Sequence, residues 1–185
     1  IEAYTAANKN PIADGLALQA MRLIARHLPL AVATPGDKVA RGQMLIAAHI
    51  AGLAFNSTGV GLVHAMAHVV GARHGVHHGT ANAICLPHVI RFNAAALGGS
   101  YRDVAEALGI DARDLGDDMA GEAAAQAVAQ LAARIKLPAR LRDVGVPEGD
   151  LDGCAAASLA DGALVSSGKQ VTEKNLVLGV YRHAY

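Results

Sequence analysis

Histidines are the residues of this sequence best placed to do chemistry. The chain has nine histidines in 185 residues, and five of them are clustered: His64, His68, His74, His77 and His78. His64 and His68 are four residues apart, so on a helix both imidazoles share one face. Neutral imidazole is a common ligand of divalent transition metals. The spacing alone is equally compatible with an ordinary pair of exposed or hydrogen-bonded histidines.

His78 adds to the case for a metal site. It precedes Gly79 at the start of a further predicted helix, after a loop short enough to reverse the chain. Such a reversal can return His78 to the face that carries His64, and two imidazoles from different elements supply half of a four-coordinate site. No Asp or Glu lies in the segment, so the other half must come from elsewhere. The zinc peptidase motif is excluded, because Ala65 stands where that motif needs a glutamate.

The elements around these histidines are predicted to be helices throughout. Alanine is frequent and no segment alternates apolar and polar residues with period two, so we expect an all-α fold. We expect Pro29 to break the first helix, the second helix to be central because it is apolar on most sides, and Thr172 to cap the last. The predicted helices span residues 11–27, 38–55, 62–70, 78–96, 101–108, 117–135, 150–159 and 172–183.

Composition narrows the classes of function. Sixteen basic residues balance sixteen acidic ones without a basic stripe, so we expect no nucleic-acid partner. The longest apolar stretch, residues 44–55, is interrupted by His49 and is shorter than the roughly 20 residues that span a bilayer, so we expect no membrane segment. The two cysteines, Cys85 and Cys154, form no disulfide framework or CxxC pair, which favours a reducing, cytoplasmic setting.

Residues 59–93, GVGLVHAMAHVVGARHGVHHGTANAICLPHVIRFN, carry a specific pattern. This stretch resembles the signature region of iron-containing (group III) alcohol dehydrogenases, G-x-x-H-A-x-A-H-x-x-G followed after a short loop by H-G-x-x-N-A-x-x-L-P. The resemblance extends to residues 1–4 (IEAY), 51–55 (AGLAF) and 171–176 (VTEKNL), so it covers nearly the whole chain.

The resemblance implies a fold and a domain organisation. Residues 1–185 would form an all-α, helical bundle-like domain, the C-terminal metal-binding and catalytic domain of this family, which is similar to that of dehydroquinate synthases. A nucleotide-binding domain would be N-terminal to it and is absent from this chain. In the family, two further metal ligands, an Asp and a His, lie in the motif D-A-x-x-H-A-I-E-A-Y. This chain begins at the Ile of that motif, with IEAY, and so does not include either of these ligands. We therefore expect the chain alone to be inactive.

The resemblance also implies roles for three histidines. His64 and His78 match family metal ligands, and His68 matches a catalytic histidine close to the reacting centre and the nicotinamide. The implied cofactors are Fe²⁺ or Zn²⁺, together with NAD or NADP bound mainly by the N-terminal domain. The implied reaction is hydride transfer between an alcohol and an aldehyde or ketone, in an enzyme that works as a homo-oligomer.

Two other functions stay open. Glycerol dehydrogenase and dehydroquinate synthase relatives share this kind of domain, and a non-catalytic helical interaction domain with a relict metal site would have the same pattern. The chain also departs from the family, with His77 in place of a proline and Arg73 and His74 where aromatic residues are common. We expect His74 and His77 to line the mouth of the cleft.

The remaining candidates are assigned structural roles. Cys85 lies in an apolar run with no cation nearby, which predicts a buried thiol and not a nucleophile. Met44, Phe55 and Met66 are predicted core residues. We expect hydrogen bonding at helix ends or behind the site from Asn82 and Asn93, and structural or surface positions for the outlying histidines, His27, His49, His88 and His183.

Overall fold

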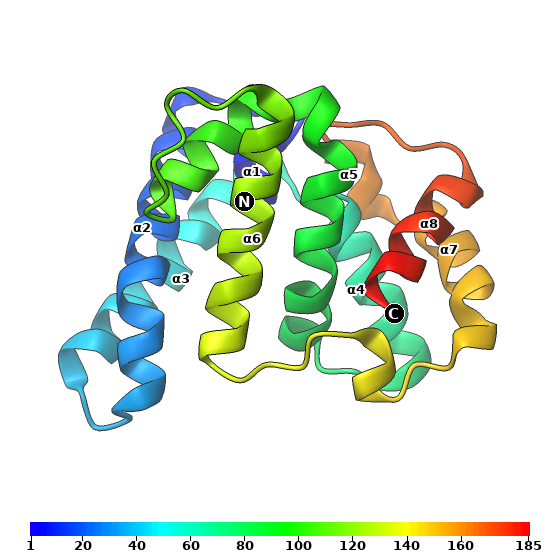
Figure 1. Ribbon diagram of the computed structural model, residues 1–185, viewed down its shortest axis with the longest axis horizontal. Coiled ribbons are helices and arrows are strands. Elements are labelled where there is room, and N and C mark those ends of the chain that lie inside the picture. Colours follow the sequence, from blue (N-terminus) through cyan, green and yellow to red (C-terminus); the bar gives the residue numbers. More distant parts are fainter.

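The computed structural model describes all 185 residues, and its regular elements are helices, as predicted (Figure 1). There is no strand. The α-helices are α1 (Glu2–Thr5), α2 (Pro11–Ala33), α3 (Lys38–Thr58), α4 (Leu62–His74), α5 (His78–Ala107), α6 (Asp117–Arg134), α7 (Leu151–Leu159) and α8 (Lys174–Ala184). Three short 3₁₀ helices join the later elements: η1 (Leu141–Val144), η2 (Glu148–Asp150) and η3 (Gly162–Ser166).

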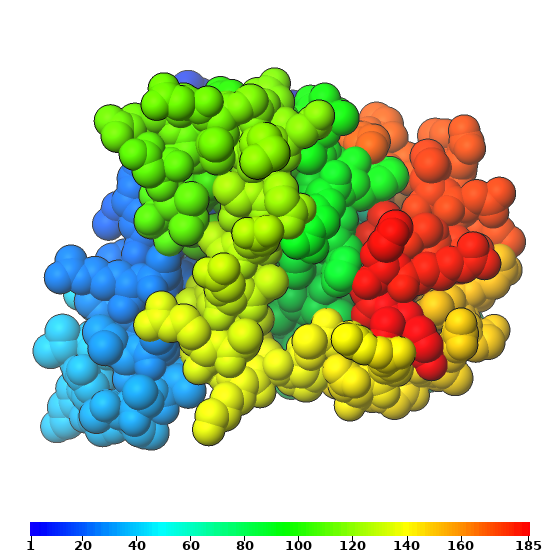
Figure 2. Space-filling view, viewed as in Figure 1, coloured from blue at the N-terminus to red at the C-terminus, as the bar shows by residue number.

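Helix α5 is the central element of the fold. It packs along α6 over most of its length and also contacts α4, α8 and α2 (Figure 1). One hydrophobic core lies where α4 and α5 meet α7 and α8, and includes Met66 and Tyr181. A second core lies where α1 and α2 meet α5 and α6, and includes Met21 and Tyr101. The space-filling view shows α5, α6 and α8 on one face of the molecule (Figure 2).

The prediction that the helix after residue 38 is central is wrong, because α3 lies at the edge of the fold beside α2. Its buried positions are mostly small alanines that allow close packing, whereas its large apolar side chains point outward. Leu45 is 74% exposed and Phe55 is 47% exposed, so Phe55 is not a core residue. No single helix is long and apolar enough to cross a membrane; α3 and α4 pass that test only as a pair bent by 106°.

Several helix ends differ from the predicted ones. α2 continues through Pro29 to Ala33 and packs along α3, so Pro29 does not end this helix. The two helices predicted over 78–96 and 101–108 are joined in α5, with a non-helical break at Leu97 (φ −130°, ψ 19°). Glu173, and not Thr172, is the residue that precedes α8.

The close crossing of α5 and α6 depends on Gly98. A Cβ at this position would lie 2.1 Å from Cβ of Asp117 and 2.7 Å from its Cα, whereas a Cβ at Gly99 would have nothing within 4 Å. We expect Gly98→Ala to lower the free energy of unfolding by about 1–3 kcal/mol through overpacking. The adjacent control Gly99→Ala should be neutral or should raise it by up to about 1 kcal/mol. Urea unfolding followed by circular dichroism measures both, and equal effects would contradict the crossing described here.

Candidate active site

The structure brings the three predicted site histidines together. His64 and His68 are one turn apart on α4, and His78 is the first residue of α5. Ring centroids are 5.4 Å apart for His64 and His78, 5.5 Å for His68 and His78, and 6.0 Å for His64 and His68. Two imidazoles that bind one ion at about 2.1 Å have centroids about 5 Å apart, so these rings are at a spacing that suits a shared ligand.

A tight reversal between α4 and α5 makes this convergence possible. Gly75 follows α4 in the left-handed conformation (φ 67°), and its N–H donates to the carbonyl of Gly71 at 3.0 Å. Glycine adopts this conformation at low cost, which is why it commonly ends helices. Only Gly75, Val76 and His77 separate the two helices, so His78 returns directly beside α4.

A carboxylate from α1 orients His64. Glu2 Oε2 lies 2.6 Å from His64 Nδ1, and Glu2 Oε1 accepts the Val63 N–H at 2.7 Å. The first contact leaves Nε2 of His64 as the nitrogen free to bind a ligand. A carboxylate on the far nitrogen is the usual partner of a metal-binding histidine, because it fixes the ring and raises its basicity.

A second carboxylate orients His68. Nδ1 of His68 lies 3.0 Å from Asp161 Oδ2. Asp161 Oδ1 accepts the Ala163 N–H at 2.8 Å at the start of η3. With Nδ1 held as a donor, Nε2 of His68 is the nitrogen that can accept or release a proton. Sequence reasoning missed both carboxylates, because no local pattern connects them to their histidines. Glu2 is 62 positions from His64, and Asp161 is 93 positions from His68.

His78 is held less firmly than the other two. The Asn82 side-chain Nδ2 lies 2.9 Å from both the His78 backbone oxygen and His78 Nε2, so an ion at Nε2 would displace this amide. Asn82 Oδ1 is buried without a hydrogen-bond partner, so an unsatisfied acceptor lies beside the histidines. Burial lowers the pKa of His78, and the neighbouring His64 and His68 lower it further. The neutral imidazole favoured by that shift is the form that binds metals.

A largely apolar cavity of about 390 Å³ adjoins this cluster. Its polar edge includes His64, Glu2 and Asn82, and its apolar wall comes from α2, α4, α5 and α6. A concave apolar space with a few converging polar groups is the usual form of a small-molecule site. The three histidines, the two carboxylates and this cavity therefore fit a divalent metal with a small organic substrate beside it.

Other predicted residues lie away from this chemistry. Cys85 is fully buried, as predicted, and burial raises the pKa of its thiol to about 12, which disfavours the thiolate that a nucleophile needs. The expectation for His74 is wrong: it ends α4 and contacts Asp150 and Cys154 instead of lining the cleft. The local sequence could not show this, because Cys154 lies 80 residues further along the chain. His77 precedes α5 as an exposed residue.

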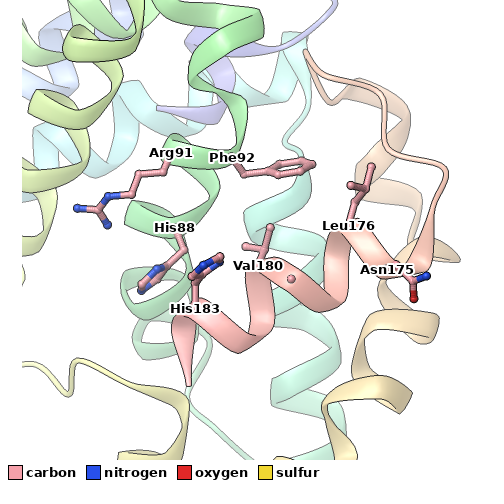
Figure 3. A pocket seen from close by; sticks show the side chains of 8 residues that line it. His88, Arg91, Phe92, Asn175, Leu176, Val180 and His183 are labelled. Carbon is pink, nitrogen blue, oxygen red and sulfur yellow. The ribbon is translucent and has the colours of Figure 1, made fainter.

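A cavity of about 610 Å³ lies between α5 and α8 and contains none of the three site histidines (Figure 3). His88 and Arg91 from α5 and His183 from α8 face it together with apolar side chains. Burial, with the neighbouring Arg91 and His183, lowers the pKa of His88 to about 4. This shift favours the neutral imidazole near pH 7, which has one N–H donor and one acceptor nitrogen.

The whole chain, residues 1–185, matches the family described as Fe-containing alcohol dehydrogenase, C-terminal. The chain belongs to the iron-containing alcohol dehydrogenase family. This confirms the resemblance found in the histidine signature, and it places the chain in the C-terminal, helical part of that family.

Curated relatives of the family are similar over almost all of this chain. The 1,3-propanediol dehydrogenase of Citrobacter freundii is 42% identical over 185 residues, which are 100% of this chain and 48% of that protein. The lactaldehyde reductase of Escherichia coli (strain K12) is 38% identical over 177 residues, 96% of this chain and 46% of that protein. The chain thus spans about half the length of these relatives.

Solved structures agree with the fold. The crystal structure of a 1,3-propanediol oxidoreductase has a TM-score of 0.95 at 40% identity, over 100% of this chain and 48% of that one. The alcohol dehydrogenase from Oenococcus oeni has a TM-score of 0.96 at 33% identity with the same coverage. The iron-containing family and a relative named as an NAD-dependent methanol dehydrogenase, from Bacillus methanolicus, support a metal and NAD.

Glu2 should control metal affinity through His64. Glu2→Gln keeps the size of the side chain but replaces the charged partner of His64 Nδ1. We expect metal affinity in the full-length protein to fall about 10- to 100-fold, as for other carboxylates behind metal-binding histidines. Competition with a chelator measures the dissociation constant, with the exposed Glu106→Gln on α5 as control. Unchanged affinity in Glu2→Gln would contradict the role assigned to this contact.

Proposed function

We propose that this chain is the catalytic part of a metal-dependent NAD(P) alcohol dehydrogenase that interconverts a small alcohol and its aldehyde or ketone. The observation that carries the proposal is the convergence of His64, His68 and His78 beside an apolar cavity, in a chain of the iron-containing family. The family match favours this activity over that of glycerol dehydrogenase or dehydroquinate synthase. The orienting carboxylates favour an active site over a relict one.

The proposed metal ligands in this chain are His64 and His78. Further ligands and the nucleotide-binding domain are proposed to lie outside these 185 residues, because the chain has no G-x-G-x-x-G loop and its relatives are about twice as long. When bound, Fe²⁺ or Zn²⁺ would polarise the substrate oxygen and NAD or NADP would carry the hydride. We accordingly expect the 185-residue chain alone to be inactive.

The residues of this chain would position the metal ligand, exchange the proton and bind the substrate. Glu2 holds the His64 ring so that its Nε2 faces away from α1. His68, held at Nδ1 by Asp161, would exchange the hydroxyl proton of the substrate at Nε2 and could also contact the nicotinamide. The apolar cavity would receive the carbon chain of the substrate and exclude water from the reacting atoms.

Short hydroxylated substrates are the class we propose. The relatives are named for 1,3-propanediol, lactaldehyde and methanol, and all of these molecules have three carbons or fewer. A dehydrogenase assay with 1,3-propanediol, 1,2-propanediol, methanol and the matching aldehydes tests this, with NAD and NADP compared in parallel.

Removing the metal in that assay tests most directly whether the activity depends on it. We expect the chelator-treated full-length protein to lose its activity and to regain it with Fe²⁺ or Zn²⁺, because the substrate oxygen needs a Lewis acid. The absence of turnover with every substrate in the presence of metal and cofactor would contradict the proposal. So would full activity after complete removal of the metal.

A further inference from the structure

Three side chains of different metal-binding chemistry meet outside the active site. His74 ends α4, Asp150 ends η2, and Cys154 lies one turn into α7. One ligand atom from each lies within 4.8 Å of the others. His74 Nε2 is 2.8 Å from Asp150 Oδ2, and Cys154 Sγ is 3.7 Å from each of these two atoms.

These separations are close to those around a tetrahedral ion. With bonds of about 2.3 Å to sulfur and about 2.0–2.1 Å to nitrogen and oxygen, ligand atoms on one zinc ion stand about 3.4–3.6 Å apart. The two distances from the sulfur already match to within about 0.3 Å. The nitrogen–oxygen pair, now at hydrogen-bond distance, would have to open by about 0.6 Å, which small side-chain rotations of His74 and Asp150 can supply.

We propose that His74, Asp150 and Cys154 form a second divalent-metal site, of the zinc-binding class, that ties α4 to α7. A mixed nitrogen, oxygen and thiolate set suits zinc, and water would complete the four ligands. The site is distinct from the histidine cluster, since His64 and His74 are ten residues apart on α4, about 15 Å along its axis.

Some charges around the cluster oppose the binding of a cation, and others favour it. Arg73 contacts both oxygens of Asp150 and adds a positive charge next to the site. Against this, Cys154 would bind as thiolate and release its proton to solvent, and the C-terminal end of α4 favours a cation at His74. The bound ion would replace the His74–Asp150 hydrogen bond, while Arg73 could keep its contact with Oδ1.

The buried and exposed faces of the cluster fit such a site. Cys154 is fully buried and forms no disulfide, whereas the side chains of His74 and Asp150 are 14% and 24% exposed. An ion can therefore enter from the side of His74 and Asp150 and reach the sulfur behind them. Cys85, the other cysteine, is buried in α5 outside the cluster and provides a matched control.

Cobalt titration of the full-length protein tests the proposal, because only a thiolate ligand gives the intense near-ultraviolet charge-transfer band of sulfur-bound Co²⁺. We expect this band in the parent protein and in Cys85→Ser, and its loss in Cys154→Ser. His74→Ala, a change at a partly exposed position, should weaken Co²⁺ binding at the thiolate at least about tenfold, the effect of about 1.4 kcal/mol. Circular dichroism confirms that each variant is folded.

The result is independent of the proposed enzyme activity. The band should persist in His64→Ala with His78→Ala, a protein in which the active-site metal is expected to be lost. Absence of the band in the parent protein at saturating Co²⁺ would overturn the second site and leave these residues as an ion-pair cluster. An equal band in Cys154→Ser would overturn it as well.

Discussion

Replacing His78 with alanine is expected to remove the active-site metal and to lower kcat/KM by at least about 1000-fold. His78 is one of two proposed ligands in this chain, and its ring centroid lies 5.4 Å from that of His64. Lewis-acid stabilisation of the substrate oxygen is worth several kcal/mol, and a loss of about 4 kcal/mol corresponds to three powers of ten in rate. Metal analysis of the purified full-length variant, combined with steady-state kinetics, measures both effects.

The adjacent histidine provides the control for this experiment. His77 is exposed and precedes α5, and its side chain makes no capping hydrogen bond. We expect His77→Ala to keep its metal and most of its activity. A His78→Ala protein with a full complement of metal and near-normal kcat/KM would show that His78 is not a ligand.

His68→Ala should have the second-largest effect, and one of a different kind. Its ring is 5.5 Å from that of His78 but is held by Asp161, and its proposed role is proton exchange. Loss of a general acid–base group lowers turnover by about 100- to 10,000-fold, so we expect kcat to fall by that amount while metal content stays near normal. Metal content and kcat measured on the same preparation distinguish the two roles.

Two outcomes would contradict this division of labour. Metal loss in His68→Ala equal to that in His78→Ala would make His68 a ligand, and unchanged kcat would remove it from the reaction. His49→Ala, at an exposed position on α3, is the control for a histidine lost elsewhere and should leave both quantities unchanged.

Helix positions were predictable because the patterns that encode them are local. The start of α2 at Pro11 and the start of α3 at Lys38 follow from caps and apolar spacing within one or two turns. The passage of α2 through Pro29 was not predictable in this way, because proline inside a helix usually ends or kinks it. The peripheral place of α3 was missed for a similar reason: apolar composition alone does not say which face a neighbour covers.

The same distinction between local and long-range contacts decides which site residues could be predicted. His64, His68 and His78 could be found because they lie within one helix and the turn that follows it, where spacing determines which side chains meet. Glu2 and Asp161 reach these histidines only through the tertiary fold, as do Asp150 and Cys154 at His74. Contacts across such sequence distances leave no periodic signal, so these partners became visible only in the structure.

The central claim is that His64 and His78 share one metal ion, and a crystal structure of the metal-loaded full-length protein tests it most directly. An anomalous difference map recorded at the absorption edge of the metal locates the ion without reference to any assumed function. We predict a peak about 2.0–2.2 Å from one ring nitrogen of each histidine, with His68 nearby but outside bonding distance. A map of the fully loaded protein with no peak between His64 and His78 would contradict the account.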